Sequence, residues 1–151
     1  MADLNQLIRE YLQEAKIMQI ATKINEQPWV CSVWYASDDQ MNIYWMSATN
    51  RRHSKELEKN PKVGATISLQ IPSNESPRGV QLQGIAQKLT KNDDIQKARS
   101  VFQDRVFDGR TIDSYLNNKK TTYAFYRLKP TLYVLYDAKH FPENPRQEFT
   151  V

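Results

Sequence analysis

Apolar residues near the start of the chain recur at the spacing of a helix. Asp3 and Gln6 lie where the side chains of a capping box would begin one. The apolar stripe consists of Leu4, Leu7, Ile8, Tyr11, Leu12 and Ala15. Because these residues fall on one helical face, the pattern predicts an amphipathic helix over residues 3–15.

From residue 18 onward apolar and polar residues alternate, which is the period of a half-buried strand. The alternation is clearest in residues 63–71. Polar segments at 25–28 and 37–40 predict hairpin turns, and Gly84 is expected to mark a bulge or bend. The predicted strands cover residues 18–24, 29–36, 41–46, 63–71 and 79–89.

Helical segments interrupt this series of strands. A short charged helix follows residue 50 and must end before Pro61, because the residue before a proline avoids the helical conformation. A helical excursion is predicted over residues 92–117, with its first helix ending at Gly109.

Residues 121–141 close the predicted series. They should form two strand pieces broken at Pro130, since proline cannot donate to a central ladder. The tail from Pro142 is expected to be loose. Short hairpins and half-buried alternation favour an antiparallel barrel over a parallel sheet covered by helices. We expect a single domain over residues 1–151, because no repeat or linker divides the chain.

Composition narrows the class of protein. The chain of 151 residues has a formal net charge of +4, and its basic residues are scattered, which mostly serves solubility. Its one cysteine excludes an intrachain disulfide, and His53 and His140 are too far apart for a recognisable zinc spacing, so no metal site is predicted. No apolar run reaches membrane-spanning length. We therefore expect a soluble, cytoplasmic protein that does not act at a membrane.

The strand-to-helix turn at residues 47–55 carries the strongest candidate chemistry. Arg51, Arg52 and Lys55 lie near the helix N-terminus, where their charge opposes the helix dipole unless an anion binds. With Ser47, His53 and free backbone N–H groups, the turn could hold a phosphate. The alternative is a solvated basic surface helix.

Aromatic residues gather on the second and third predicted strands. They could line a pocket for a planar ligand, but aromatic residues in short strands more often serve core or interface packing. The group comprises Trp29, Trp34, Tyr35, Tyr44 and Trp45. We expect packing for most of them.

The order of elements and two segments resemble the FMN-binding split barrels of the pyridoxamine 5'-phosphate oxidase-like superfamily. The segments are YWMSATNRRHSKELEKNP at residues 44–61 and RGVQLQGIAQKL at residues 78–89. The resemblance extends from about Met18 to Tyr136. It implies a mainly β (α+β) fold, an antiparallel split β-barrel of about six strands with flanking helices. It also implies a homodimer with FMN at the interface.

Alignment on Leu57 and Pro61 carries the family's flavin site onto this chain. Ser47 would lie near the ribityl chain, and the phosphate pair would fall at Arg52 and His53, where the family has a lysine in place of the histidine. The family also has a serine where this chain has Arg51. The full set implied by the resemblance is Ser32, Val33, Trp34, Ser47, Ala48, Arg51, Arg52, His53, Lys55 and Gln81.

The individual roles in this set differ. Backbone groups of residues 32–34 would face the flavin edge, and Lys55 would add charge near the phosphate. Gln81 is a shifted substitute for a glutamine that the oxidases carry directly after an arginine, where this chain has Gly79.

The resemblance implies an FMN-dependent oxidoreductase acting on a small molecule, with no protein side chain as nucleophile. The C-terminal arginine and histidine motif for pyridoxamine phosphate is missing, so the substrate stays open. One alternative is a non-catalytic flavin- or haem-binding sensor with His53 or His140 as axial ligand. Another is nucleic-acid binding through the basic turn, although we expect no nucleic-acid partner.

Overall fold

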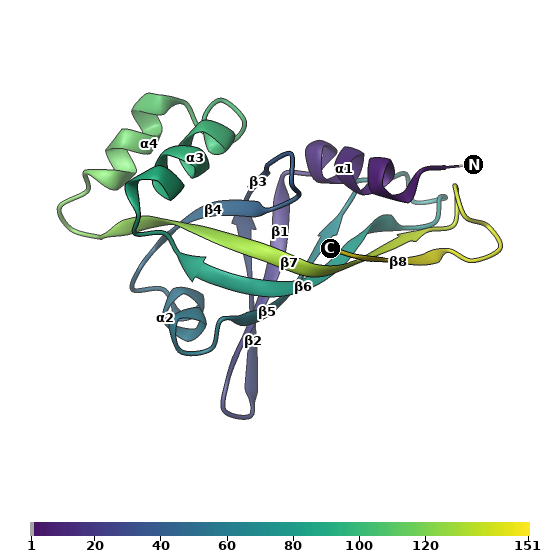
Figure 1. The fold of residues 1–151 in the computed structure, drawn as a ribbon, viewed down its shortest axis with the longest axis horizontal. Coiled ribbons are helices and arrows are strands. Elements are labelled where there is room, and N and C mark those ends of the chain that lie inside the picture. The colour runs from purple at the N-terminus through teal and green to yellow at the C-terminus, as the bar shows by residue number, and fades with distance from the viewer. Residues whose placement is uncertain (1) are drawn as a thin grey trace.

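The computed structural model describes residues 2–151 and consists of a curled antiparallel sheet flanked by helices (Figure 1). The strand order is β2-β1-β5-β6-β7-β4-β3, and β8 pairs with β7 beside this path. The strands are β1 (Ile17–Ile24), β2 (Gln27–Trp34), β3 (Ala36–Ser37), β4 (Ile43–Ala48), β5 (Lys62–Ser68), β6 (Arg78–Lys88), β7 (Tyr123–Asp137) and β8 (Arg146–Thr150). The helices are α1 (Leu4–Glu14), α2 (Arg52–Lys59), α3 (Asn92–Phe102) and α4 (Gly109–Leu116).

This arrangement confirms the predicted mainly β split-barrel fold. The strand count is higher than expected because of the two-residue strand β3 and the C-terminal strand β8. The tail was expected to be loose, but Arg146–Thr150 pairs with Leu132–Tyr136 of β7. The exposed edge offered by β7 decides this pairing, so the tail's own sequence gave little sign of it.

The prediction of a break at Pro130 is wrong, because β7 runs through it as one strand of fifteen residues. Pro130 pairs with Gly84 of β6 where the register shifts, so its missing N–H falls at a bulge. The bulge expected at Gly84 is confirmed. A Cβ on Gly84 would lie 2.2 Å from the carbonyl oxygen of Lys129, so this close approach of the two strands requires glycine.

Two hydrophobic clusters hold the molecule together. The larger one lies between the sheet and helices α1 and α2, and contains Ile8, Leu12, Ile20, Trp45 and Leu57. The smaller one lies under α3 and α4, which sit together at one end of the sheet (Figure 1). Helix α1 covers the other end, with its first turn capped by Asp3, whose side chain accepts from the Gln6 N–H at 3.2 Å.

Helix α3 ends at Phe102, earlier than the stop predicted at Gly109, and Gly109 instead begins α4. Asp104 adopts a left-handed backbone conformation with φ of 63°, which takes the chain out of the helical direction. The Asp104 N–H then donates to the Phe107 carbonyl at 2.7 Å. Residues 103–108 therefore form a tight turn. No helix in residues 2–151 has the length and apolar character needed to cross a bilayer.

Candidate functional site

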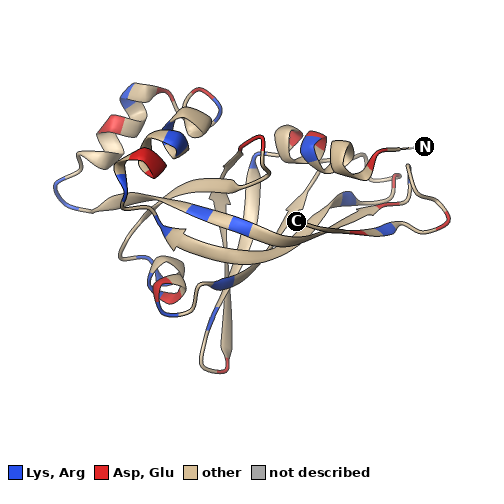
Figure 2. Cartoon of the chain, viewed as in Figure 1, with Lys and Arg blue, Asp and Glu red and all other residues tan. Residues whose placement is uncertain are grey.

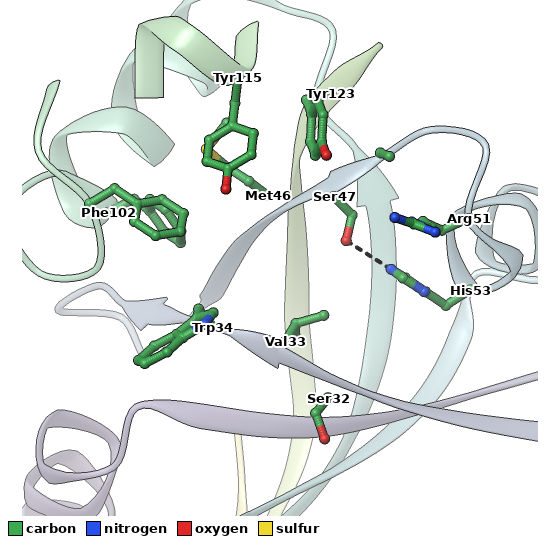
Figure 3. Close-up of a pocket in the computed structure, with 12 residues that line it drawn as sticks. Ser32, Val33, Trp34, Met46, Ser47, Arg51, His53, Phe102, Tyr115 and Tyr123 are labelled. Atoms are coloured by element: carbon green, nitrogen blue, oxygen red, sulfur yellow. Dashed lines mark hydrogen bonds between the residues drawn. The ribbon is translucent and has the colours of Figure 1, made fainter. Parts of the chain in front are cut away.

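A cavity of about 280 Å³ lies where β2, β4, the start of α2 and the helical excursion meet (Figure 3). Seven of the ten residues expected from the sequence line it: Ser32, Val33, Trp34, Ser47, Ala48, Arg51 and His53. Five further residues complete the lining: Met46, Phe102, Phe107, Tyr115 and Tyr123. The cavity thus joins a polar side to an aromatic side.

The polar side is built by the turn from β4 into α2. Ser47 Oγ and His53 Nε2 share a hydrogen bond of 2.8 Å, and Arg51 extends beside them (Figure 3). The Ser54 hydroxyl stabilises the turn by donating to the Ala48 carbonyl at 2.9 Å. The first N–H groups of α2 have no intrahelical acceptor, as at every helix start. The turn therefore combines a hydroxyl, an imidazole, a guanidinium and backbone donors.

The electrostatics of this side favour an anion. Burial lowers the pKa of His53 below its usual 6.5, and the neighbouring charge of Arg51 lowers it further. The imidazole is therefore neutral at neutral pH and available as a hydrogen-bond partner. No carboxylate lines the cavity within the described chain, and the first turn of α2 carries no acidic residue.

Arg52 does not line the cavity, although the family register assigns it to the phosphate. Its Nε donates to Glu56 Oε1 at 2.8 Å, and its guanidinium lies 4.2 Å from the ring centroid of Trp29. Glu56 is only 5% exposed and also accepts from the Thr22 hydroxyl at 2.6 Å. The hydrogen bonds from Thr22 and Arg52 lower the pKa of Glu56. This network fixes α2 against β1 and β2.

Lys55 and Gln81 also lie outside the cavity lining. Lys55 follows His53 by two residues, which places it on the opposite side of α2, where it is exposed. Gln81 is exposed on β6, between Thr66 of β5 and Val134 of β7.

The aromatic residues of the second and third predicted strands divide between packing and exposure. Tyr35, Tyr44 and Trp45 are buried, in agreement with a packing role. Trp29 and Trp34 are exposed on β2, and Trp34 borders the cavity.

Sequence reasoning missed the aromatic side of the cavity. Phe102, Phe107 and Tyr115 belong to the helical excursion, and Tyr123 begins β7. The sequence predicted only a helical excursion over residues 92–117 and a closing strand, and it singled out none of these four residues as part of a site. The spacing of Phe107 and Tyr115 carries no signal by itself, since the turn at 103–108 brings them together.

His140, the other histidine considered as a haem ligand, lies in the turn after β7. Its Nδ1 hydrogen-bonds to Asp137 Oδ2 at 2.7 Å, and it does not border the cavity. Within residues 2–151, no three histidine, cysteine or acidic side chains gather as a metal site would require.

Comparison with known proteins adds a family. The family model for pyridoxamine 5'-phosphate oxidase matches residues 4–133. A UPF0306 protein from Haemophilus ducreyi is 32% identical over 87 residues, which cover 57% of this chain and 60% of that protein. The match thus spans about three fifths of the relative's length.

Solved structures show the same fold at low sequence identity. A heme binding protein from Mycobacterium smegmatis superimposes with a TM-score of 0.78 at 17% identity, covering 99% of this chain and 59% of that one. HutZ, the heme storage protein from Vibrio cholerae, gives a TM-score of 0.70 at 19% identity, covering 85% of this chain and 91% of that one. With a family model that matches most of its length, this chain belongs to the pyridoxamine 5'-phosphate oxidase family.

Proposed function

We propose that this chain binds FMN and works as an oxidoreductase on a small molecule. The observation that carries the proposal is the donor set at the polar side of the cavity. Arg51, His53 and Ser47 line it together, without a carboxylate among the described lining residues. A phosphate dianion needs such a set of donors and cations, and would relieve the conflict between Arg51 and the dipole of α2.

The family membership supports flavin as the ligand that carries this phosphate. FMN would supply two-electron redox chemistry when bound. The chain's own residues would bind and orient it: Arg51 and His53 at the phosphate, Ser47 beside them, and the backbone of Ser32 to Trp34 along the ring edge. Trp34 and Val33 would shield that edge from water.

The size of the cavity supports a second copy of the chain as part of the site. At about 280 Å³ it lies just below the range of about 300–1,000 Å³ for small-molecule sites, so one chain would cover only part of a flavin-sized ligand. Trp34, at the cavity border, is 50% exposed and would be covered by a partner. We therefore propose a homodimer with the flavin at the interface.

FMN titration, followed by quenching of flavin fluorescence, tests the proposal. We expect Arg51→Ala to weaken FMN binding about tenfold, because it removes a charge-assisted contact to phosphate. The affinity for riboflavin, which lacks the phosphate, should stay the same. Lys59→Ala removes a cation from the last turn of the same helix and serves as the matched control.

Arg52→Ala separates the family register from the observed geometry. We expect it to lower the free energy of unfolding, through loss of the Glu56 contact, more than it lowers FMN affinity. Failure of the full chain to take up FMN would refute the proposed function. Equal FMN affinity in the Arg51→Ala variant and the unmodified chain would refute the phosphate site.

A second candidate is haem binding without catalysis. It is favoured by the position of His53, which lines the cavity, and by the two haem proteins of the same fold, although haem ligation through Nε2 would require loss of its hydrogen bond to Ser47. The absorption spectrum of the purified protein decides between them, since haem gives a Soret band and FMN gives flavin bands.

Nucleic-acid binding receives less support. Lys and Arg are interleaved with Asp and Glu over helices and loops and do not gather on one element (Figure 2).

A further inference from the structure

Three partly exposed aromatic rings line one side of the cavity, and we call Phe107, Tyr115 and Tyr123 the aromatic wall. The ring centroids of Tyr115 and Tyr123 are 4.8 Å apart, and those of Phe107 and Tyr115 are 5.5 Å apart. In Figure 3, Tyr115 and Tyr123 lie above Ser47, whereas His53 lies below it. The ring planes are tilted by 30° between Phe107 and Tyr115 and by 58° between Tyr115 and Tyr123, so the wall is a contiguous but angled cluster of rings, separate from the polar side.

The wall is held in place before any ligand binds. Phe102 is buried beneath it and makes edge-to-face contacts with Phe107 and with Phe125, both with centroids 5.7 Å apart. The turn at 103–108 fixes Phe107 through the bond from the Asp104 N–H to the Phe107 carbonyl. Asp108 then caps α4, accepting from the Thr111 N–H at 2.7 Å, which sets the direction of the helix that carries Tyr115. A preorganised surface loses little entropy on binding.

The exposure of the wall indicates a ligand surface. Residues of the same region that serve packing, Phe102 and Phe125, are almost completely buried, whereas the three wall residues are not. Among the side chains drawn in Figure 3, the only hydrogen bond joins Ser47 and His53, so the hydroxyls of Tyr115 and Tyr123 bind no other residue of the cavity lining. A planar ring against these faces would gain stacking energy and bury their apolar area.

Charge decides the kind of ring. The cavity lining in the described residues holds the cation Arg51 and no carboxylate, so Coulomb repulsion from Arg51 opposes the attraction of a cationic ring to the aromatic faces. The wall carries no cation and its ring faces repel negative charge, so an anionic group would bind at Arg51 on the polar side and not against the rings. An uncharged ring fits both conditions.

We propose that the aromatic wall binds an uncharged, planar aromatic ring of the substrate, beside the phosphate side of the same cavity. The assignment of this ring to a substrate rests on the proposed oxidoreductase function, whereas ring binding at the wall does not depend on that function. The wall would then set which small molecules reach a bound flavin.

Quinoline, a neutral planar ring at neutral pH, is a suitable probe. Its binding to the full chain can be followed by saturation-transfer NMR and isothermal titration calorimetry. We expect Tyr115→Leu to weaken quinoline binding about tenfold, through loss of stacking and of buried aromatic area. Phe107→Leu should weaken it as well and guards against a local folding defect in the first variant.

Tyr136→Leu is the matched control, because Tyr136 is a partly exposed tyrosine of β7 outside the cavity lining. Circular dichroism should show the same fold in all variants. Unchanged quinoline affinity in both wall variants would overturn the proposal. N-methylquinolinium, the cation of the same shape, and cyclohexanol, which has no aromatic ring, should bind weakly. Equal binding of either would overturn the assignment to an uncharged aromatic ring.

A parallel FMN titration separates this proposal from the proposed function. We expect Tyr115→Leu to leave FMN affinity unchanged and saturating FMN to leave quinoline affinity unchanged. If Tyr115→Leu weakens FMN as much as quinoline, or if FMN displaces quinoline, the wall holds the flavin ring and the substrate assignment is wrong. If the chain binds quinoline through Tyr115 but takes up no FMN, the flavin proposal fails while ring binding at the wall stands.

Discussion

His53 occupies the point where the hydroxyl, the cation and the helix start of the cavity meet. Its hydrogen bond to Ser47 orients the ring, while burial and the charge of Arg51 keep the imidazole neutral at neutral pH. A lysine at this position would be a permanent cation. The histidine therefore makes the charge of the polar side depend on pH, which a lysine would not.

The FMN affinity of the chain should rise as the pH falls toward the pKa of His53, because a bound phosphate favours the protonated imidazole. His53→Gln keeps a hydrogen-bonding side chain without this titration. The phosphate group's own titration is common to both proteins, so the ratio of their dissociation constants isolates the histidine. We expect the dissociation constant of the His53→Gln variant, divided by that of the unmodified chain, to grow with decreasing pH. A ratio independent of pH would contradict the role assigned to His53.

Without ligand, the same shift acts on stability in the opposite direction. The pKa of His53 is lower in the folded chain than in the unfolded chain, so the unfolded chain takes up the proton first. The contribution of His53 to the free energy of unfolding should therefore decrease as the pH falls below about 6.5. Ligand binding and stability thus respond oppositely to acid.

The turn between α3 and α4 contacts α1, which is far from it in the sequence. Arg105 Nη2 donates to the Ala15 carbonyl at 2.8 Å and also contacts the carbonyls of Leu12 and Gln13, at the C-terminal end of α1. These carbonyls have no intrahelical donor, so a cation there satisfies them and complements the helix dipole. Arg105 thereby ties the segment that carries Phe107 and Tyr115 to α1.

Arg105→Met should lower the free energy of unfolding by about 1.5–3 kcal/mol, the typical worth of hydrogen bonds to a charged group. Hydrogen exchange followed by mass spectrometry should become faster in residues 103–116. Arg110→Met is the control, because Arg110 is exposed on α4. If both variants exchange alike, Arg105 does not hold the excursion in place.

Four of the seven large apolar residues that are exposed in residues 2–151 lie on the hairpin of β1 and β2. Ile17, Val30 and Trp34 share a face of β1 and β2, with Ile17 directly opposite Trp34, and Val30 is 58% exposed. β2 is also an edge strand, and the hairpin projects beyond the rest of the sheet in Figure 1. An apolar face beside an open edge is typical of an interface, here one next to the cavity.

We expect the protein to sediment as a dimer and Val30→Glu to shift it toward monomer, because a carboxylate would be buried without a partner. FMN retention should decrease in parallel if the partner completes the site. Ile85→Glu places the same charge at an exposed apolar residue of β6, at 40% exposure, and should leave the dimer intact. A monomeric unmodified chain would contradict the proposed interface.

The amount of structure that could be predicted from sequence differs between elements. Strands whose alternation is local, such as β5, were placed well, and Gly84 was identified as a bulge because glycine in a strand has few other uses. The path of β7 through Pro130 and the pairing of β8 were missed. Both depend on the neighbouring strand, which supplies the bulge in one case and a free edge in the other.

The candidate site, too, was predicted from the sequence only in part. The sequence by itself determined the antiparallel barrel and the basic turn between a strand and a helix, since strand alternation, helix limits and basic residues are properties of short segments. Only the tertiary structure decided that Arg51 and His53 face the cavity while Arg52 pairs with Glu56, and that Phe107, Tyr115 and Tyr123 form one surface. The direction of a side chain depends on what its element packs against, and those contacts join residues distant in the chain.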